Sequence, residues 1–198
     1  DTLELPIENA TDWDGPIVRD VLHDNGLGAT ACAVLGPGRE LCEAPATVIR
    51  ATQDYLRAAI DLCAEVDAPV LGGPIYASVG RTWRVDASQR RWLLEEVRDN
   101  LVPVIEHASG AGVMLAIEPL NRYETSLITT VAQARELIDP LPSEVCGILF
   151  DTFHANIEES DVAQAIIEAG ERLAHVQASA SHRGAPGDDH IDWNAVAW

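Results

Sequence analysis

The chain has 198 residues, of which 47% are hydrophobic, and its 32 acidic residues against 13 basic ones give a formal net charge of −19. All 13 basic residues are arginine. The absence of lysine excludes Schiff-base aldolases, pyridoxal-phosphate enzymes and P-loop nucleotidases, because each needs a lysine amine. The charge argues against nucleic acid and acidic membranes as partners, since both are themselves negative. This acidic, lysine-free composition indicates either adaptation to high salt or a genome that replaces lysine by arginine.

Short apolar segments alternate with longer amphipathic ones along the chain. We predict strands at Leu3–Ile7, Ala29–Leu35, Ala68–Gly72, Val113–Glu118, Cys146–Phe150 and His175–Ala178. We predict helices between them at residues 15–25, 46–66, 87–110, 130–139 and 161–172, where apolar residues recur at helical spacing. Strands joined by helices of this length form a parallel sheet, and the near-continuous apolar strands indicate a sheet buried on both faces.

The position of the polar residues favours a barrel over an open nucleotide-binding sheet. No GxGxxG sequence follows the first strand, whereas Glu118, Asp151 and the segment 177–183 all lie at the carboxyl ends of predicted strands. Catalytic groups of (β/α) barrels gather at that end, because the loops after all the strands converge there. We therefore predict an α/β fold of the TIM-barrel type, in one domain over residues 1–198.

Two carboxylates stand at the ends of neighbouring predicted strands, Glu118 after one and Asp151 after the next. Adjacent parallel strands lie about 5 Å apart, so both side chains could reach one cation. Two carboxylates with a nitrogen or oxygen donor from the following strand suit Mn²⁺, Mg²⁺ or Co²⁺. The alternative is that both carboxylates only cap the loops that follow them.

Four motifs resemble the xylose-isomerase-like sugar isomerases and epimerases, and among these the D-tagatose/D-psicose 3-epimerases. The motifs are GGPIYASVGR at 72–81, AIEPLNRYET at 116–125, DTFHANIEE at 151–159, and HRGAPG at 182–187 before HIDW at 190–193. The resemblance implies a (β/α)8 TIM barrel with about six of its βα units in this chain. It also implies metal-dependent epimerisation of a ketose through an enediolate, with a small sugar as the partner.

The resemblance implies roles for individual residues. Glu118 would bind the metal and transfer a proton, and Asp151 would be the second metal ligand. The implied sugar-binding groups lie in loops after the strands: Glu124, His154 and Arg183. Gln177 stands where the family has a metal-binding histidine, so it is the third predicted ligand, although an amide binds most divalent metals more weakly than imidazole. The expected metal is Mn²⁺, with Mg²⁺ or Co²⁺ as alternatives.

The resemblance further implies a strand and a helix before Asp1 and more βα units after Trp198. We therefore expect the chain to be an internal piece of a barrel, incomplete at both ends. The second catalytic glutamate, which is also a metal ligand, would belong to the later region. Together with Gln177, its absence predicts impaired epimerase activity for residues 1–198 alone.

Other functions stay open at this point. Hydroxypyruvate isomerase and inosose dehydratase belong to the same barrel group, and a non-catalytic sugar-binding or structural remnant would explain Gln177. The sequence has no run of 18 apolar residues and no signal-like N-terminus, which predicts a cytoplasmic protein. Open strand edges predict a homo-oligomer.

Overall fold

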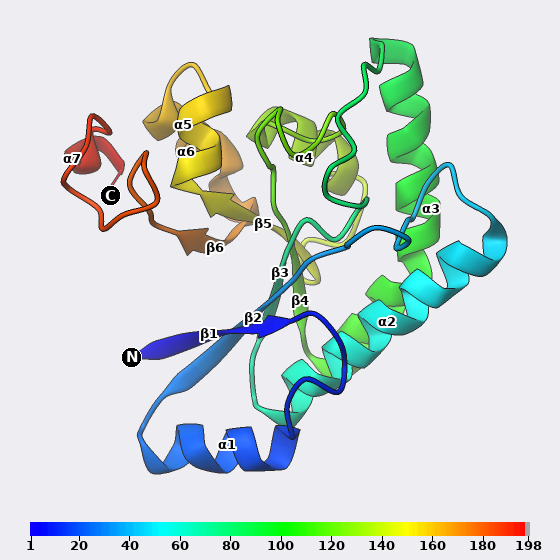
Figure 1. Ribbon diagram of the computed structural model, residues 1–198, viewed down its shortest axis with the longest axis vertical. Helices are drawn as coiled ribbons and strands as arrows, with labels where there is room; N and C mark the ends of the chain where they lie inside the picture. The colour runs from blue at the N-terminus through cyan, green and yellow to red at the C-terminus, as the bar shows by residue number, and fades with distance from the viewer. Residues whose placement is uncertain (197–198) are drawn as a thin grey trace.

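The computed structural model describes residues 1–196, in which six parallel strands form one curled sheet (Figure 1). The strands are β1 (Thr2–Ile7), β2 (Gly28–Ala33), β3 (Val70–Gly73), β4 (Met114–Ile117), β5 (Cys146–Asp151) and β6 (Leu173–Gln177). They pair in sequence order, each parallel to the next. The predicted parallel, barrel-type sheet of six strands is confirmed.

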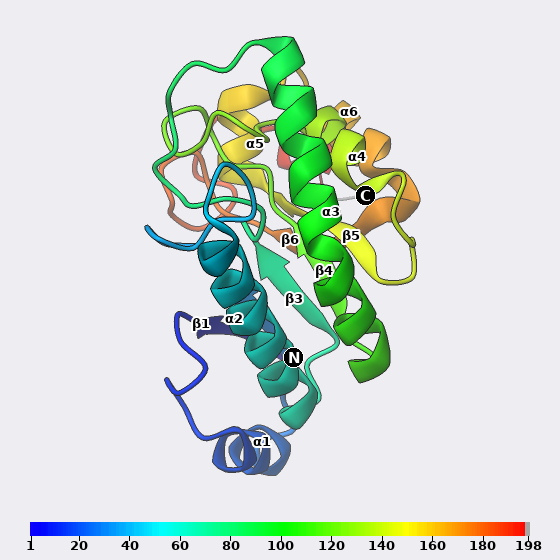
Figure 2. The same ribbon diagram turned by 90° about the vertical axis from the view of Figure 1, so that its right-hand side faces the viewer.

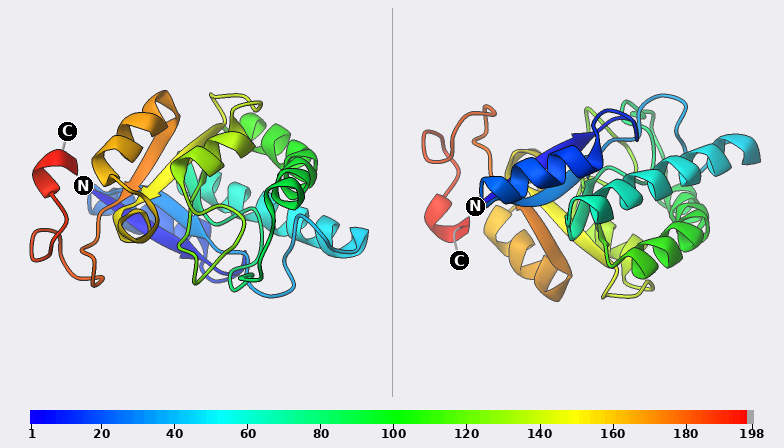
Figure 3. Two further views of the ribbon diagram at one scale, coloured as in Figure 1. Left: turned by 90° about the horizontal axis from the view of Figure 1, so that it is seen from above. Right: turned by 90° about the horizontal axis from the view of Figure 1, so that it is seen from below.

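Helices connect successive strands and pack mostly on the outside of the curve, and α7 follows the last strand. They are α1 (Gly15–Asp24), α2 (Ala46–Glu65), α3 (Ala87–Ala111), α4 (Val131–Ile138), α5 (Thr152–Glu158), α6 (Val162–Ala169) and α7 (Trp193–Val196). Figure 2 shows α2 and α3 side by side against the sheet. In the view from below in Figure 3, the helices follow one another around the strands and leave one side open, near the N-terminus and α7. Within residues 1–196, no helix is long and apolar enough to cross a membrane.

The core lies between the sheet and these helices. All six residues of β5 are buried, as expected for a strand covered on both faces. On the helix side, Leu56 and Ile60 of α2 are fully buried and belong to the same apolar cluster as Leu71 of β3. Burying an aliphatic side chain of this size stabilises the fold by about 1.5–3 kcal/mol. The strands are therefore held by the helices that join them.

Gly73 is the last residue of β3 and allows β2 and β3 to approach each other closely. Its φ of +125° is a conformation that residues with a side chain rarely adopt, and a Cβ there would lie 2.0 Å from the carbonyl oxygen of Ala33. The Gly73 carbonyl accepts the backbone N–H of Glu118 at 3.1 Å. This glycine thus determines where the residue after β4 is placed.

The predicted element boundaries agree with the structure to within two residues, except at the end of α6 and for the two short helices α5 and α7. The helix predicted over 161–172 ends at Ala169, and a 3-10 turn continues it over Gly170–Arg172. The sequence places His154 in a loop, and this is wrong, because it lies in α5. The Asp151 side chain accepts the N–H of Phe153 at 2.7 Å and starts this helix at the last residue of β5. The predicted domain over 1–198 includes residues 197 and 198, which lie outside the described part of the chain.

Candidate active site

The carboxyl ends of β4 and β5 bring three buried side chains together. Glu118 directly follows β4, Asp151 ends β5, and His154 lies in the first turn of α5. One potential ligand atom from each residue lies within 4.8 Å of the others. The predicted convergence of Glu118 and Asp151 is confirmed, and His154 joins them. The group could therefore hold a metal ion.

The electrostatics of this group favour a cation. Burial, together with the nearby Asp151 carboxylate, raises the pKa of Glu118 to about 8. Two carboxylates that are almost completely buried repel each other unless a proton, a donor or a cation lies between them. Their oxygens are the ligands that Mg²⁺ and Mn²⁺ prefer. The donor set therefore fits a hard divalent cation.

Arg183 supplies a donor to the same group from the loop after β6. Its Nη1 donates to Asp151 Oδ2 at 2.7 Å, and its guanidinium lies 3.8 Å from the centre of the Phe153 ring. The backbone of Arg183 has a φ of +64°, in the left-handed region that favours glycine. Such strained residues persist where the surroundings hold them, and they concentrate at functional sites.

The hydrogen bonds of His154 indicate that it is a donor. Burial lowers its pKa, which favours the neutral ring. The backbone N–H of Asn121 donates to Nδ1 at 3.1 Å, so the ring hydrogen belongs on Nε2. Nε2 lies 3.6 Å from Glu118 Oε1. A metal-binding histidine normally donates its other ring N–H, whereas here the other nitrogen accepts. This arrangement suits hydrogen bonding to a ligand better than metal binding.

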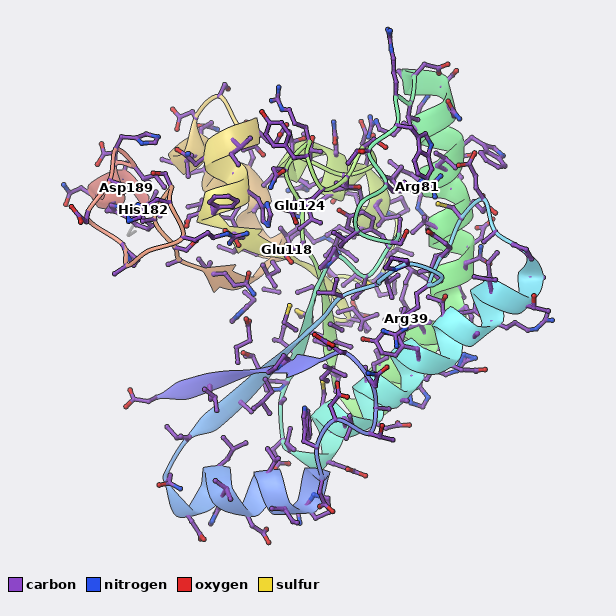
Figure 4. All side chains as sticks on the ribbon, viewed as in Figure 1. Arg39, Arg81, Glu118, Glu124, His182 and Asp189 are labelled. Atoms are coloured by element: carbon purple, nitrogen blue, oxygen red, sulfur yellow. The ribbon has the colours of Figure 1, made fainter. Side chains whose placement is uncertain are left out.

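Glu124 completes one side of the site. Its Oε1 accepts from Asn121 Nδ2 at 2.7 Å and lies 4.0 Å from His154 Nδ1. Glu118 and Glu124 are labelled in Figure 4, where both lie near α5. Arg183 Nη2 lies 3.1 Å from His154 Nε2. With the ring hydrogen on Nε2, two donors converge there, and an oxygen of a bound ligand could accept from both.

Gln177 lies beside this group and is directed elsewhere. It pairs with Asp151 in the sheet, but its Nε2 donates to Glu4 Oε1 at 2.7 Å. The other oxygen of Glu4 lies 2.7 Å from His175 Nε2. The role of Gln177 as a metal ligand stays a prediction. The sequence does not single out Glu4, because its contact with β6 depends on how far the sheet curls.

The loop after β6, which carries Arg183, is also stabilised by hydrogen bonds within the C-terminal segment. The Asp189 carboxylate accepts from the indole Nε1 of Trp193 at 2.7 Å. Figure 4 shows His182 and Asp189 in this loop, away from Glu118. The structure thus places these two residues outside the cluster. Asn121 is the functional candidate that the sequence does not single out, although it lies within the AIEPLNRYET motif.

Comparison with known proteins identifies the family. Residues 2–198 match the family model described as the xylose isomerase-like TIM barrel. The chain belongs to this family. The resemblance that the four motifs carry is therefore confirmed at the level of the family and its fold.

Several sugar epimerases resemble the chain over most of its length. A ketose 3-epimerase of Arthrobacter globiformis is 29% identical over 194 residues, covering 98% of this chain and 66% of that protein. A probable ketose 3-epimerase of Synechocystis sp. is 34% identical, over 85% of this chain and 58% of that protein. A solved structure of L-ribulose 3-epimerase superimposes with a TM-score of 0.90 at 29% identity, covering 99% of this chain and 65% of that one. This chain spans at most two thirds of the length of each of these relatives.

Proposed function

We propose that this chain acts in the divalent-metal-dependent epimerisation of a ketose, at the carbon next to its carbonyl group. The observation that carries the proposal is the buried pair Glu118 and Asp151, with donors from Arg183 and His154 directed at the same place. The similarity to ketose 3-epimerases supports the substrate class. Carboxylates and donors in this arrangement suit proton removal beside a carbonyl group.

Each group has a distinct part in the proposed reaction. Glu118 and Asp151, with Gln177 as the proposed third ligand, would hold the metal, and Mn²⁺ is the proposed ion. When bound, the cation would stabilise negative charge developing on the ketone oxygen. The Glu118 carboxylate takes the proton from the carbon next to the ketone. The electron pair of the broken C–H bond then forms the double bond of an enediolate.

The remaining groups orient the sugar. Arg183 and His154 donate hydrogen bonds to its oxygens, and Glu124 accepts from a hydroxyl group. Epimerisation also needs an acid on the opposite face of the enediolate to return a proton. Among the described residues, Glu118 is the proposed group for proton removal, and this is the step that the experiments test.

A second candidate reaction is epimerisation at another carbon of a keto sugar. A 3-dehydro-D-guloside 4-epimerase of Escherichia coli is 36% identical over 100 residues, which is half of this chain. The same carboxylates and donors could remove a proton beside a carbonyl at C3. A 3-keto glycoside therefore belongs in the assay beside the ketoses, and hydroxypyruvate and an inosose test the other reactions of the barrel group.

Two properties complete the proposal. We propose a cytoplasmic location, which is supported by the four cysteines, all of them within the described residues and all free thiols. We also propose a homo-oligomer, because within residues 1–196 the strands β1 and β6 each pair with one other strand only. Neither property is needed for the chemistry.

Metal binding is the first test. Mn²⁺ should raise the melting temperature, because a ligand that binds the native state alone stabilises it by RT ln(1 + [L]/Kd), about 2.7 kcal/mol at 100 times Kd. Glu118→Gln and Asp151→Asn should each remove most of this gain. Glu96→Gln removes a carboxylate on α3 and serves as the control. No shift with Mn²⁺ in the parent chain would contradict the metal assignment.

A further inference from the structure

Asn121 contacts two of the proposed sugar-binding groups, and no step of the proposed reaction uses it. It is 2% exposed although it lies in the loop after β4. Its Nδ2 donates to Glu124 Oε1 at 2.7 Å and lies 2.9 Å from His154 Nδ1. Its backbone N–H donates to the same Nδ1 at 3.1 Å. A single buried residue thus places donors against both groups.

The Asn121 amide has a defined orientation. Its Oδ1 accepts the backbone N–H of Tyr123 at 2.9 Å, so Nδ2 is the atom that faces Glu124 and His154. The backbone carbonyl of Asn121 accepts the backbone N–H groups of Glu124 at 3.0 Å and Thr125 at 3.1 Å. These bonds close a tight turn around the side chain. The amide therefore cannot turn over without losing hydrogen bonds at both ends.

The same loop is also fastened to α5, which carries His154. Arg122 donates its backbone N–H and its Nε to Glu158 Oε1 at 2.7 and 2.8 Å. Glu158 lies at the end of α5, and its side chain is largely buried. The distance between the Asn121 turn and the His154 ring is therefore held by two independent sets of contacts.

The donors on Nδ1 determine the state of the His154 ring. A neutral imidazole has one nitrogen with a lone pair and one with a hydrogen. Two N–H donors of Asn121 face Nδ1, whereas one donor, Arg183 Nη2, lies 3.1 Å from Nε2. A hydrogen on Nε2 therefore avoids two donor–donor contacts and leaves one. The opposite tautomer would place an Nδ1–H group against two N–H donors of Asn121 and remove the donor that faces Glu118.

We propose that Asn121 is a positioning residue, which keeps the His154 hydrogen on Nε2 and holds the Glu124 carboxylate in place. The kinetic consequence rests on the proposed function, whereas the tautomer of His154 does not. A structural residue that only filled space would leave the tautomer unchanged when replaced by an isosteric side chain. The state of the ring is therefore the decisive readout.

The first experiment measures that state by long-range proton–nitrogen NMR on the whole chain, without metal or sugar. His154→Gln identifies the His154 signals among those of the six histidines. The wild type should show Nε2–H. Asn121→Asp replaces the amide donor by an acceptor of the same size and should shift the ring toward Nδ1–H. Asn156→Asp, which makes the same charge change on α5 away from the His154 contacts, should leave the ring unchanged.

Two results would overturn the inference: an Nδ1–H ring in the wild type, or an unchanged Nε2–H ring in a folded Asn121→Asp variant. If Asn121→Asp does not fold, Asn121→Ala tests the contact with Glu124, because it retains the backbone donor to Nδ1 and removes the Nδ2 donor that faces Glu124 and His154. Asn121→Ala should keep Nε2–H and raise KM for the ketose with a smaller effect on kcat. An unchanged KM in this variant would contradict the role of Asn121 in holding Glu124.

Kinetics separate this inference from the proposed function. With a ketose and Mn²⁺, Asn121→Asp should lower kcat/KM by roughly 10–100-fold, the usual effect of losing a residue that orients a site group. Asn156→Asp should lower it much less. If the wild type exchanges no proton of any ketose in D₂O, the proposed function fails, and the NMR result still decides whether Asn121 fixes the ring.

Discussion

At the scale of single residues, Gly73 links the backbone of the sheet to the chemistry of the site. Its carbonyl accepts the N–H of Glu118, and a Cβ at this position would lie 2.0 Å from the Ala33 carbonyl oxygen. A residue with a side chain cannot adopt this position without moving β2 or β3. The placement of the proposed proton acceptor thus depends on a residue that itself has no side chain.

Gly73→Ala should therefore destabilise the protein by roughly 3 kcal/mol or more, since it combines a positive φ with a clash against backbone. Urea denaturation measures the loss of free energy of unfolding. Gly110→Ala is the matched control, because a Cβ at Gly110 of α3 meets no atom within 4 Å. It should be neutral or stabilising by up to about 1 kcal/mol. Equal stabilities of the two variants would contradict this account of Gly73.

At the scale of elements, a buried arginine ties together the loops around the site. Arg81 follows β3 and is 3% exposed. Its guanidinium pairs with Glu43, lies 3.6 Å from Glu40 Oε2, and donates to Cys42 Sγ at 3.2 Å. Its carbonyl accepts the N–H of Ser126, in the loop that carries Glu124. Three connecting segments therefore meet at one residue, two of them through its side chain and backbone contacts with 40–43 and Ser126. Figure 4 labels Arg81.

Arg81→Met should cost about 3 kcal/mol, because it leaves carboxylates without their partner in a partly buried place. This value is at the lower end of the range for breaking a buried ion pair, since the Glu43 side chain is 34% exposed. Arg135→Met breaks an exposed pair between α4 and Asp139 and a hydrogen bond from Arg135 Nη1 to the Glu168 carbonyl, and it should cost about 1 kcal/mol. Thermal or urea denaturation distinguishes the two variants. A loss at Arg81 no larger than that at Arg135 would count against this interpretation.

The sequence predicts well those helices and strands that are specified by the spacing of apolar residues within the segment itself. The alternation of buried strands and amphipathic helices is visible in the order of apolar residues, and β5 is predicted almost to its ends. Helix α5 is missed because it is only seven residues long and begins at a strand residue, Asp151, whose side chain caps it. A segment of two turns contains too few apolar positions to show a helical period.

The site residues also divide into those that the local sequence predicts and those that depend on the folded chain. The convergence of Glu118 and Asp151 could be predicted, because parallel strands bring their carboxyl ends to one edge. The contacts of Glu4 with His175 and Gln177 span more than 170 residues of sequence and depend on the curvature of the whole sheet. The roles of Asn121 and Arg81 arise from hydrogen bonds between loops, and a pattern of neighbouring residues in the sequence does not predict such bonds.

At the scale of the whole molecule, the sheet has two outer strands. Within residues 1–196, β1 pairs only with β2, and β6 only with β5. Large apolar side chains are exposed on or near these strands: Leu3 of β1, Val176 of β6, and Ile17 and Val21 of α1. Unpaired strand edges favour pairing with another chain. The net charge of −19 opposes such pairing, and salt screens that repulsion.

Residues 1–198 should therefore self-associate, and more strongly as salt is raised. Light scattering over a range of protein and NaCl concentrations measures this. Val176→Lys places a charge on β6 and should weaken association. Val102→Lys, a similarly exposed site on α3, is the control. A monomer at all concentrations and salt levels, with one cooperative melting transition, would contradict the prediction.

The central claim is that Glu118 removes a proton from the carbon next to the carbonyl of a bound ketose. The most direct measurement is deuterium uptake at C3 of fructose, psicose, tagatose and sorbose in D₂O with Mn²⁺, followed by mass spectrometry. We expect uptake into at least one sugar, its loss with a chelator, and a decrease of roughly 10²–10⁴-fold in Glu118→Gln. Uptake that is unchanged in Glu118→Gln, or no uptake from any of the four sugars, would contradict the claim.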